Sequence, residues 1–513
     1  MGRRYDEPHG PNLSTAERSR VSLTQERTSL SRVHWLHVLA LTCLLAAVGI
    51  STFTFKISVL DLDLGWHLKT GDWIIQHFAV PHNGLFTWTA ADHPWAAYSW
   101  GYEVLLSRAN AWFGLTGIAL YGTLLTLGVT YSIYWMARRL SGNFWIALLI
   151  TIFSCSAFLM ALSPRPVFFS MILFCVTLTL LLEASRSGNE KLLYWLPLVF
   201  FLWANLHIQF IYGLFAVGLM MAVNLSMEIL GKLGRKIDWV QPRTIPAASL
   251  MTVFALCVFA TCLSPYSYHL YGIVTRYAQS KVAYHIIMEL QPVNFSVGSH
   301  YVTLLWMAFA FFAVGRQKKV DQFKFILLCA TGVIAFRTMR DSWFICISGA
   351  ACIADAAADA VLPDAGDSWL ERAGVAVLLV ITLAVAAWKT DFNDVRLEQT
   401  MAQTLPVNAV NYLKEHPARG PLYNTMDWGG FLAWYLPEQP VSIDGRTDLY
   451  GDQMEELSYR TAAGAPSYIN DPYLNAAGVV LLQRQNRLWN ILENDARFQL
   501  VYQDGISAVF VRK

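Results

Sequence analysis

The stretch DLDLGWHLKTGDWI, residues 61–74, follows an apolar run over residues 35–56. A helix that crosses a bilayer needs roughly 20 apolar residues, so this run is long enough to span a membrane. The two aspartates then stand where the chain leaves the bilayer. If residues 63–76 are helical, Asp63 and His67 lie on one face, four positions apart. The sequence therefore predicts a membrane span that is followed, at the membrane boundary, by a pair of carboxylates.

The composition of the whole chain agrees with a membrane protein. Of its 513 residues, 55% are hydrophobic and only 14% are charged, whereas soluble proteins carry roughly 25% charged residues. Mean hydropathy is +0.38 and the net charge is +2. These values exclude a soluble multidomain enzyme, a disordered protein and a basic nucleic-acid-binding protein. All eight cysteines lie in apolar runs, without the spacing of a metal site or a disulfide framework.

The expected architecture is mainly α: a polytopic membrane helix bundle with about eleven spans. Lys and Arg concentrate in alternate loops, which places the N-terminal segment in the cytoplasm and, with an odd number of spans, the C-terminal segment outside. We expect a disordered cytoplasmic tail at 1–33 and a membrane domain at 34–388 with an outside loop at 57–114. The expected spans lie near 35–56, 115–137, 143–162, 166–184, 192–206, 208–230, 244–264, 299–315, 322–339, 342–361 and 372–388.

The C-terminal segment, residues 389–513, has ordinary polarity. Short β-type runs occur at 479–482 and 498–502, and helical patterns occur at 408–416 and 487–494. Strands that alternate with helices indicate a small α/β domain. This segment is long enough to form a core of its own.

The aspartates at the end of the first span are candidates for general acid–base chemistry. A carboxylate at a bilayer boundary loses hydration, which raises its pKa and makes it a better general base. The competing interpretation is that Asp61 or Asp63 only caps the helix that follows.

Two further outside segments interrupt apolar runs with polar residues. Arg165 lies between Pro164 and Pro166, so it is held at a rigid break where a guanidinium suits a phosphate. A snorkelling arginine at a helix end is the alternative. Asn205 and His207 interrupt another run and predict either a polar cavity or a hydrogen bond between helices.

More cations and aromatic residues fall on the same outside face. Together with the aspartates they indicate a site for an anionic ligand that contains a ring, although an ordinary belt of snorkelling side chains would give the same pattern. The charged members of this set are Arg276, Lys281, Glu289, Arg337, Arg340 and Asp341.

In their order and spacing these motifs resemble the GT-C superfamily of membrane glycosyltransferases, and within it a bacterial branch. The superfamily includes protein mannosyltransferases, aminoarabinose transferases and oligosaccharyltransferases. The resemblance extends from about residue 35 to 513. The motifs are D-x-D-x-x-W-H-L-x-x-G-x-W-I at 61–74, Arg-Pro at 165–166, W-A-N-L-H at 203–207, S-P-Y at 264–266, E-x-x-P at 289–292, W-G-G-F-L at 428–432 and I-D-G-R-x-D-x-Y at 443–450.

The resemblance implies an inverting hexosyl- or pentosyltransferase in a bacterial plasma membrane, with its C-terminal domain outside. It would take a sugar from a polyprenyl-phosphate donor to a lipid, glycan or protein acceptor. Asp61 or Asp63 would be the general base, with His67 beside it, and the same two aspartates are the candidate ligands if a divalent metal ion is bound. The implied phosphate-binding residues are Arg165, His207, Arg276, Arg337 and Arg340, and the acceptor or accessory residues are Asn205, Glu289, Asp444 and Arg446.

Two other functions remain alternatives at the level of sequence. A transporter of lipid-linked glycans would place ionisable residues near the bilayer midplane and often shows internal repeats. A non-catalytic glycan-assembly protein would use the C-terminal domain as a binding module, with the glycines at 429–430 and 445 serving tight turns.

Overall fold

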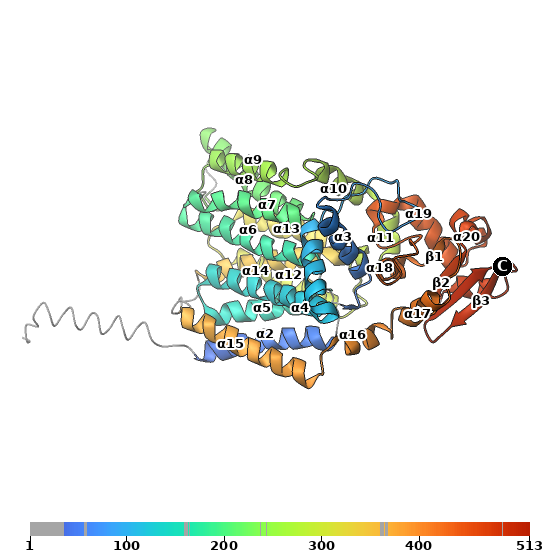
Figure 1. Ribbon diagram of the computed structural model, residues 1–513. Helices are drawn as coiled ribbons and strands as arrows, with labels where there is room; N and C mark the ends of the chain where they lie inside the picture. Colours follow the sequence, from blue (N-terminus) through green and yellow to red (C-terminus); the bar gives the residue numbers. More distant parts are fainter. Residues whose placement is uncertain are drawn as a thin grey trace, which may run out of the picture.

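The computed structural model describes residues 35–513, except 56–58, 159–162, 164, 236–237, 243, 360–363, 365–367 and 485. The expected tail at 1–33 and Pro164 lie outside the described residues. Figure 1 shows a bundle of helices packed side by side, with a small sheet and several short helices at one end.

The bundle is a polytopic membrane fold, and the expected spans all coincide with helices. Among the described residues five helices are long and apolar enough to cross a membrane: α2, α4, α6, α8 and α15. The bundle helices are α2 (Trp35–Phe55), α4 (Trp100–Ser141), α5 (Phe144–Phe158), α6 (Val167–Ser187), α7 (Leu196–Leu206, preceded by the 3₁₀-helix η3, Glu190–Trp195), α8 (Phe210–Lys232), α9 (Ala247–Thr261), α12 (Ser299–Gly315), α13 (Gln322–Arg337), α14 (Ser342–Ala357) and α15 (Trp369–Lys389).

Helix α4 differs from the expectation, because it begins at Trp100 and not near residue 115. It continues for 42 residues and kinks at Gly114, where φ is 60° and ψ is −147°. A Cβ at Gly114 would lie 2.1 Å from the Asp394 carboxylate, and the Thr116 amide donates a 2.8 Å hydrogen bond to that same group. The last part of the expected outside loop at 57–114 is therefore helical and tied to the C-terminal segment.

Between the bundle and the sheet lie short helices from the segments that the sequence predicts to be outside the membrane (Figure 1). Helix α3 packs on α4 and on α18, and the approach is close enough that a Cβ at Gly65 would lie 2.0 Å from the Gly430 carbonyl oxygen. The outside helices are α3 (Leu64–His77), α10 (His269–Gln279), α11 (Val282–Ile286), η4 (Met288–Leu290) and η5 (Met339–Asp341).

The C-terminal segment forms the expected α/β domain around a four-stranded sheet of order β1-β2-β4-β3. Strands β1 and β2 are parallel, and β4 is antiparallel to both β2 and β3. The strands are β1 (Leu422–Asn424), β2 (Val479–Gln483), β3 (Phe498–Gln503) and β4 (Ser507–Arg512); the helices are α16 (Asp394–Met401), α17 (Val407–Glu415), α18 (Met426–Tyr435), α19 (Thr447–Ala462), η6 (Pro466–Asn470), α20 (Pro472–Ala476) and α21 (Arg487–Leu492).

This domain is not separate from the outside loop, because the two share a hydrophobic core. Trp66 and Trp95 of the loop pack with Ile443, Leu449 and Met454 of the domain. Burial of these large side chains against each other is favourable by roughly 25 cal/mol per Å² of apolar surface. The shared core fixes residues 445–448 at the end of the bundle, beside α3.

Candidate active site

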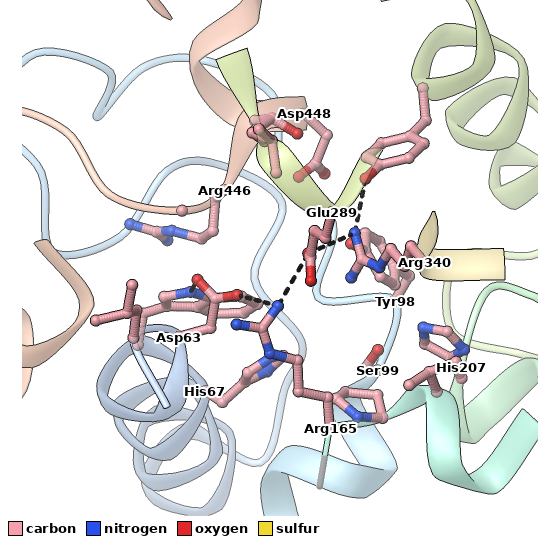
Figure 2. Close-up of a pocket in the computed structure, with 18 of the residues that line it drawn as sticks. Asp63, His67, Tyr98, Ser99, Arg165, His207, Glu289, Arg340, Arg446 and Asp448 are labelled. Carbon is pink, nitrogen blue, oxygen red and sulfur yellow. Dashed lines mark hydrogen bonds and ion pairs between the residues drawn. The ribbon is translucent and has the colours of Figure 1, made fainter. Parts of the chain in front are cut away.

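A cavity of about 490 Å³ lies where the bundle, the outside loop and the C-terminal domain meet. Its volume is in the range of roughly 300–1,000 Å³ that is typical of ligand sites. Figure 2 shows charged side chains converging on it from several elements. The polar residues that line the cavity are Asp63, His67, Tyr98, Ser99, Glu103, Arg165, His207, Tyr277, Glu289, Arg340, Asp427, Arg446, Thr447 and Asp448.

Arg165 is the centre of an ion network in this cavity. Its Nε lies 2.6 Å from Asp61 Oδ2, and its Nη1 lies 3.2 Å from both Asp63 Oδ2 and Glu289 Oε1. Glu289 also faces Arg340, 3.6 Å away, and Arg340 donates a 2.9 Å hydrogen bond to the Tyr277 hydroxyl. The sequence predicts these charges on one face, and the structure brings all five of them into one network.

Asp61 and Asp63 have different environments. The Asp61 carboxylate accepts hydrogen bonds from Arg165, from the Ser163 hydroxyl and from the Asp63 amide, and Asp61 does not line the cavity. Asp63 lines the cavity, and its Oδ1 accepts a 3.1 Å hydrogen bond from the Trp66 indole. Asp63 occupies the N-cap position of α3 without a side-chain capping bond, so helix capping does not explain its carboxylate.

The same contacts shift the pKa values of the two aspartates in opposite directions. Burial alone would raise the pKa of Asp61, but the Arg165 charge and the hydrogen bonds from Arg165 and Ser163 hold it below its ordinary value. Burial raises the pKa of Asp63 in spite of the Arg165 charge, and the neighbouring Asp61 charge adds to that rise. Asp63 is therefore the more basic carboxylate and the one that a ligand reaches.

The helical spacing favours a pair between His67 and Asp63, but in the structure His67 pairs with another carboxylate. Its Nδ1 lies 3.1 Å from Glu103 Oε1, in the first turn of α4. Burial lowers the pKa of His67 although Glu103 opposes this change, so the ring is neutral near pH 7. Glu103 was not among the expected site residues. In the sequence, Glu103 is marked as a site residue only by being an acidic residue at the start of an apolar helix.

His207 lines the cavity, whereas Asn205 does not. His207 follows the last residue of α7, and its Nδ1 is 2.8 Å from the Ser170 hydroxyl. The Asn205 side chain is held by Trp100 and by the Phe201 carbonyl. The sequence predicts either a polar cavity or a hydrogen bond between helices for these two residues. The structure places His207 in the cavity and gives Asn205 a hydrogen bond to Trp100 of another helix.

Two of the expected phosphate ligands lie elsewhere. Arg276 and Arg337 are exposed, and neither lines the cavity. The Arg337 guanidinium lies over the Tyr284 ring, 5.4 Å from its centroid. The cations that line the cavity among the described residues are Arg165, Arg340 and Arg446.

The loop before α19 supplies a buried ion pair. Arg446 Nη2 is 2.5 Å from Asp444 Oδ2, both side chains are fully buried, and only Arg446 lines the cavity. The Arg446 guanidinium also lies 4.7 Å from the centroid of the Trp95 ring. Between the pair, a Cβ on Gly445 would lie 2.0 Å from Asp63 Oδ1. Glycine is needed here because the loop contacts the carboxylate directly.

Asp448, which belongs to the I-D-G-R-x-D-x-Y motif at 443–450, lines the cavity. Burial raises its pKa from near 3.8 to about 6, although the Arg446 charge lowers it. Folding therefore favours the protonated form, and ionisation of Asp448 opposes folding as the pH rises from about 4 to 6.

We expect an Asp448→Asn variant to gain stability relative to the wild type between pH 4 and pH 7, by at most about 3 kcal/mol at 1.36 kcal/mol per pKa unit. Thermal unfolding of the two proteins across this pH range measures the change. Asp452 on the same helix is the matched control, because hydrogen bonds from Ser280 and Lys281 outweigh its burial and lower its pKa. Asp452→Asn should change stability with pH in the opposite direction. A pH-independent difference for Asp448→Asn would contradict the prediction.

The residues present do not form a metal-binding set. Among the described residues no group of three His, Cys, Asp or Glu side chains is placed to hold a metal ion. The two candidate ligands, Asp61 and Asp63, both face the Arg165 guanidinium, which takes the position that a cation would take between them.

The bundle has a polar cavity at one end, covered by the loop at 57–114 and by the C-terminal α/β domain, and its fold is similar to that of solved oligosaccharyltransferase structures. No family model matches the chain, and no curated protein matches it in sequence. Solved structures do match it. The archaeal oligosaccharyltransferase AglB from Archaeoglobus fulgidus, in complex with an inhibitory peptide and a dolichol-phosphate, has a TM-score of 0.55 at 11% identity over 88% of this chain and 69% of that chain.

Two further structures have similar values. The apo form of the Archaeoglobus fulgidus oligosaccharyltransferase has a TM-score of 0.50 at 12% identity, over 88% of this chain and 70% of that chain. ArnT from Cupriavidus metallidurans, bound to undecaprenyl phosphate, has a TM-score of 0.47 at 13% identity, over 94% of this chain and 98% of that chain. At such identities the likeness concerns the fold, and the activity is argued from the cavity.

Proposed function

We propose that the protein is a membrane glycosyltransferase that moves a sugar from a polyprenyl-phosphate donor to an acceptor hydroxyl or amide. The observation that carries this proposal is the cavity in which a basic carboxylate, Asp63, faces the Arg165 guanidinium, while a second guanidinium, Arg340, lines the same cavity beside Glu289. Transfer from a lipid phosphate needs these two kinds of group: one to take a proton from the acceptor, the other to stabilise the departing phosphate. The dolichol-phosphate bound by the archaeal oligosaccharyltransferase of similar fold supports this donor class.

The phosphate binds beside Arg165, Arg340 and Tyr277. A guanidinium presents a planar fork of donors that matches phosphate oxygens, and the two arginines lie on either side of Glu289. Glu289 holds them in place before the donor enters. His207, whose ring is fixed by Ser170, is a neutral donor at the same wall.

The chemical step is an inverting displacement with Asp63 as the general base. Asp63 takes the proton of the acceptor as the acceptor atom attacks the anomeric carbon. The bond from that carbon to the phosphate oxygen breaks, and polyprenyl phosphate leaves with the electron pair. Asp61 acts through Arg165, which it orients, and His67 is a positioning residue at the start of α3.

In this proposal residues 1–33 are cytoplasmic, and the C-terminal domain from residue 389 lies on the outer face of a bacterial plasma membrane. The Lys and Arg bias of the loops supports that orientation. The outer compartment lacks nucleotide sugars, so a lipid-linked donor fits a cavity on that side.

A transporter would need ionisable groups along a path through the bundle. At the other end of the described bundle the buried Lys324 and Asp355 are already paired with each other, and the exposed Arg186 donates to the same carboxylate. None of these three residues lines the cavity at the outer end. This arrangement supports a transferase and does not favour transport.

Donor consumption tests the proposal directly. The full chain, purified and reconstituted in liposomes with membrane acceptors, is incubated with polyprenyl phosphates that carry labelled hexoses or pentoses. We expect label to move to an acceptor while free polyprenyl phosphate appears in equal amount. If no donor in the set is consumed by the wild-type protein, the proposal is wrong.

A further inference from the structure

Part of the cavity wall is polar but lacks hydrogen-bond partners. Among the described residues, four side chains that line the cavity contain a buried polar atom with no partner. Buried polar groups are almost always hydrogen-bonded, so each exception calls for an explanation. The four atoms are Trp95 Nε1, Ser99 Oγ, Glu103 Oε2 and Arg446 Nη1.

These side chains are nearly inaccessible and held in place. Ser99 and Glu103 are each 1% exposed, at the start of α4. The other oxygen of Glu103 is occupied by His67, and the other nitrogens of Arg446 are occupied by Asp444 and by the Leu85 carbonyl. Glu103 and Arg446 are therefore held by these contacts, and each of the four side chains keeps one hydrogen-bonding atom free.

The free atoms differ in kind from the groups around the phosphate. Two are N–H donors, one is a hydroxyl that donates and accepts, and one is a carboxylate oxygen that only accepts. A second phosphate would meet Glu103 and Asp448 on this wall and be repelled. A ring bearing hydroxyl groups offers donors and acceptors together and matches the mixed set.

Figure 2 shows how this wall relates to the ion network. Arg446 and Asp63 lie on one side of Glu289, and Arg340 and His207 lie on the other. Ser99 lies on the side of Arg340 and His207, across the cavity from Arg446. A sugar whose phosphate is held by Arg340 and Arg165 therefore lies between Ser99 and Arg446 in the same cavity.

We propose that Trp95, Ser99, Glu103 and Arg446 form the binding site for the donor's sugar ring, and that this sugar carries no carboxylate. The inference rests on the proposed function and adds the class of sugar and the residues that select it. The hydroxyls satisfy the four free atoms, and the acidic side chains of the wall exclude a uronic acid.

Binding measurements on the full chain in nanodiscs test the site. The probes are bare polyprenyl phosphate and the same carrier bearing glucose, galactose, mannose, N-acetylglucosamine, aminoarabinose or glucuronic acid. At least one neutral or amino sugar should bind about tenfold or more tightly than the bare carrier, as expected from one or two hydrogen bonds. The glucuronic acid lipid should gain nothing.

Variants show whether this wall is responsible. Ser99→Val and Glu103→Gln should each remove most of the gain from the sugar while the bare carrier binds as before. Ser154→Ala and Glu455→Gln are matched controls, because both residues also have a buried polar atom without a partner but do not line the cavity. They should leave the gain unchanged.

Three outcomes overturn the inference. In the first, every sugar-bearing lipid binds no better than the bare carrier, which would mean that water and not a sugar occupies the space beside the four residues. In the second, the gain survives in both variants. In the third, the glucuronic acid lipid binds best. If bare polyprenyl phosphate itself does not bind, the proposed function fails, and that result is distinct from a carrier that binds without any gain from its sugar.

Discussion

An Asp63→Asn variant is expected to lose about 10²- to 10⁴-fold of the transfer rate, the usual contribution of a general base. The amide keeps the shape of the side chain but cannot take a proton. Donor binding should persist, because Arg165 and Arg340 still face each other across Glu289. Single-turnover transfer and carrier binding, measured on the same preparation, separate the two effects.

The pH profile adds a second readout for Asp63. A base must be deprotonated to act, so wild-type activity should fall as the pH drops through the pKa of Asp63, which burial raises above its ordinary value. Asp72→Asn is the matched control: Asp72 lies on the same helix, accepts a hydrogen bond from Ser107 and does not line the cavity. It should retain activity. Full activity in Asp61→Asn, Asp63→Asn and the double variant would exclude an aspartate base.

An Arg165→Ala variant is expected to lose about 10²- to 10³-fold of the transfer rate, as when one donor to a developing anion is removed. It should also weaken binding of bare polyprenyl phosphate. Without the guanidinium, the Asp61 and Asp63 carboxylates lose their cation and Glu289 keeps only Arg340, so the protein should also lose about 1–3 kcal/mol of stability.

Arg165→Lys separates charge from geometry. Lysine keeps one positive charge but cannot face Asp61, Asp63 and Glu289 with a planar fork, so stability should recover more than activity. Arg337→Ala is the control, because Arg337 comes from the same outside face and does not line the cavity. Equal losses in Arg165→Ala and Arg337→Ala would show that Arg165 has no special role.

The sequence predicts the bundle well, because a long apolar run has few structures open to it in a membrane. The predicted spans at 35–56 and 166–184 agree with α2 and α6 to within a few residues. The sequence does not predict the start of α4, because the segment from Trp100 to Gly114 contains charged residues. A search for apolar runs therefore does not include this first part of the helix.

The sequence predicts only the part of the site whose charged residues are placed on the same side of the membrane by the expected topology. The sequence predicts Asp61, Asp63, Arg165 and Glu289 on one face of the membrane, and in the structure these four side chains meet. The pairing of His67 with Glu103, 36 residues away, depends on how α3 packs against α4. No periodicity in the sequence contains that information.

The contact of Gly445 with Asp63 also has a consequence for biogenesis. Arg446 and Asp448 follow the last long apolar helix, α15, in the chain, so the membrane helices are made before the residues that complete the cavity. During synthesis the nascent bundle contains Asp63 and Arg165 without the loop that covers them. The cavity is therefore complete only after the loop at 445–448 has been made and has packed beside Asp63.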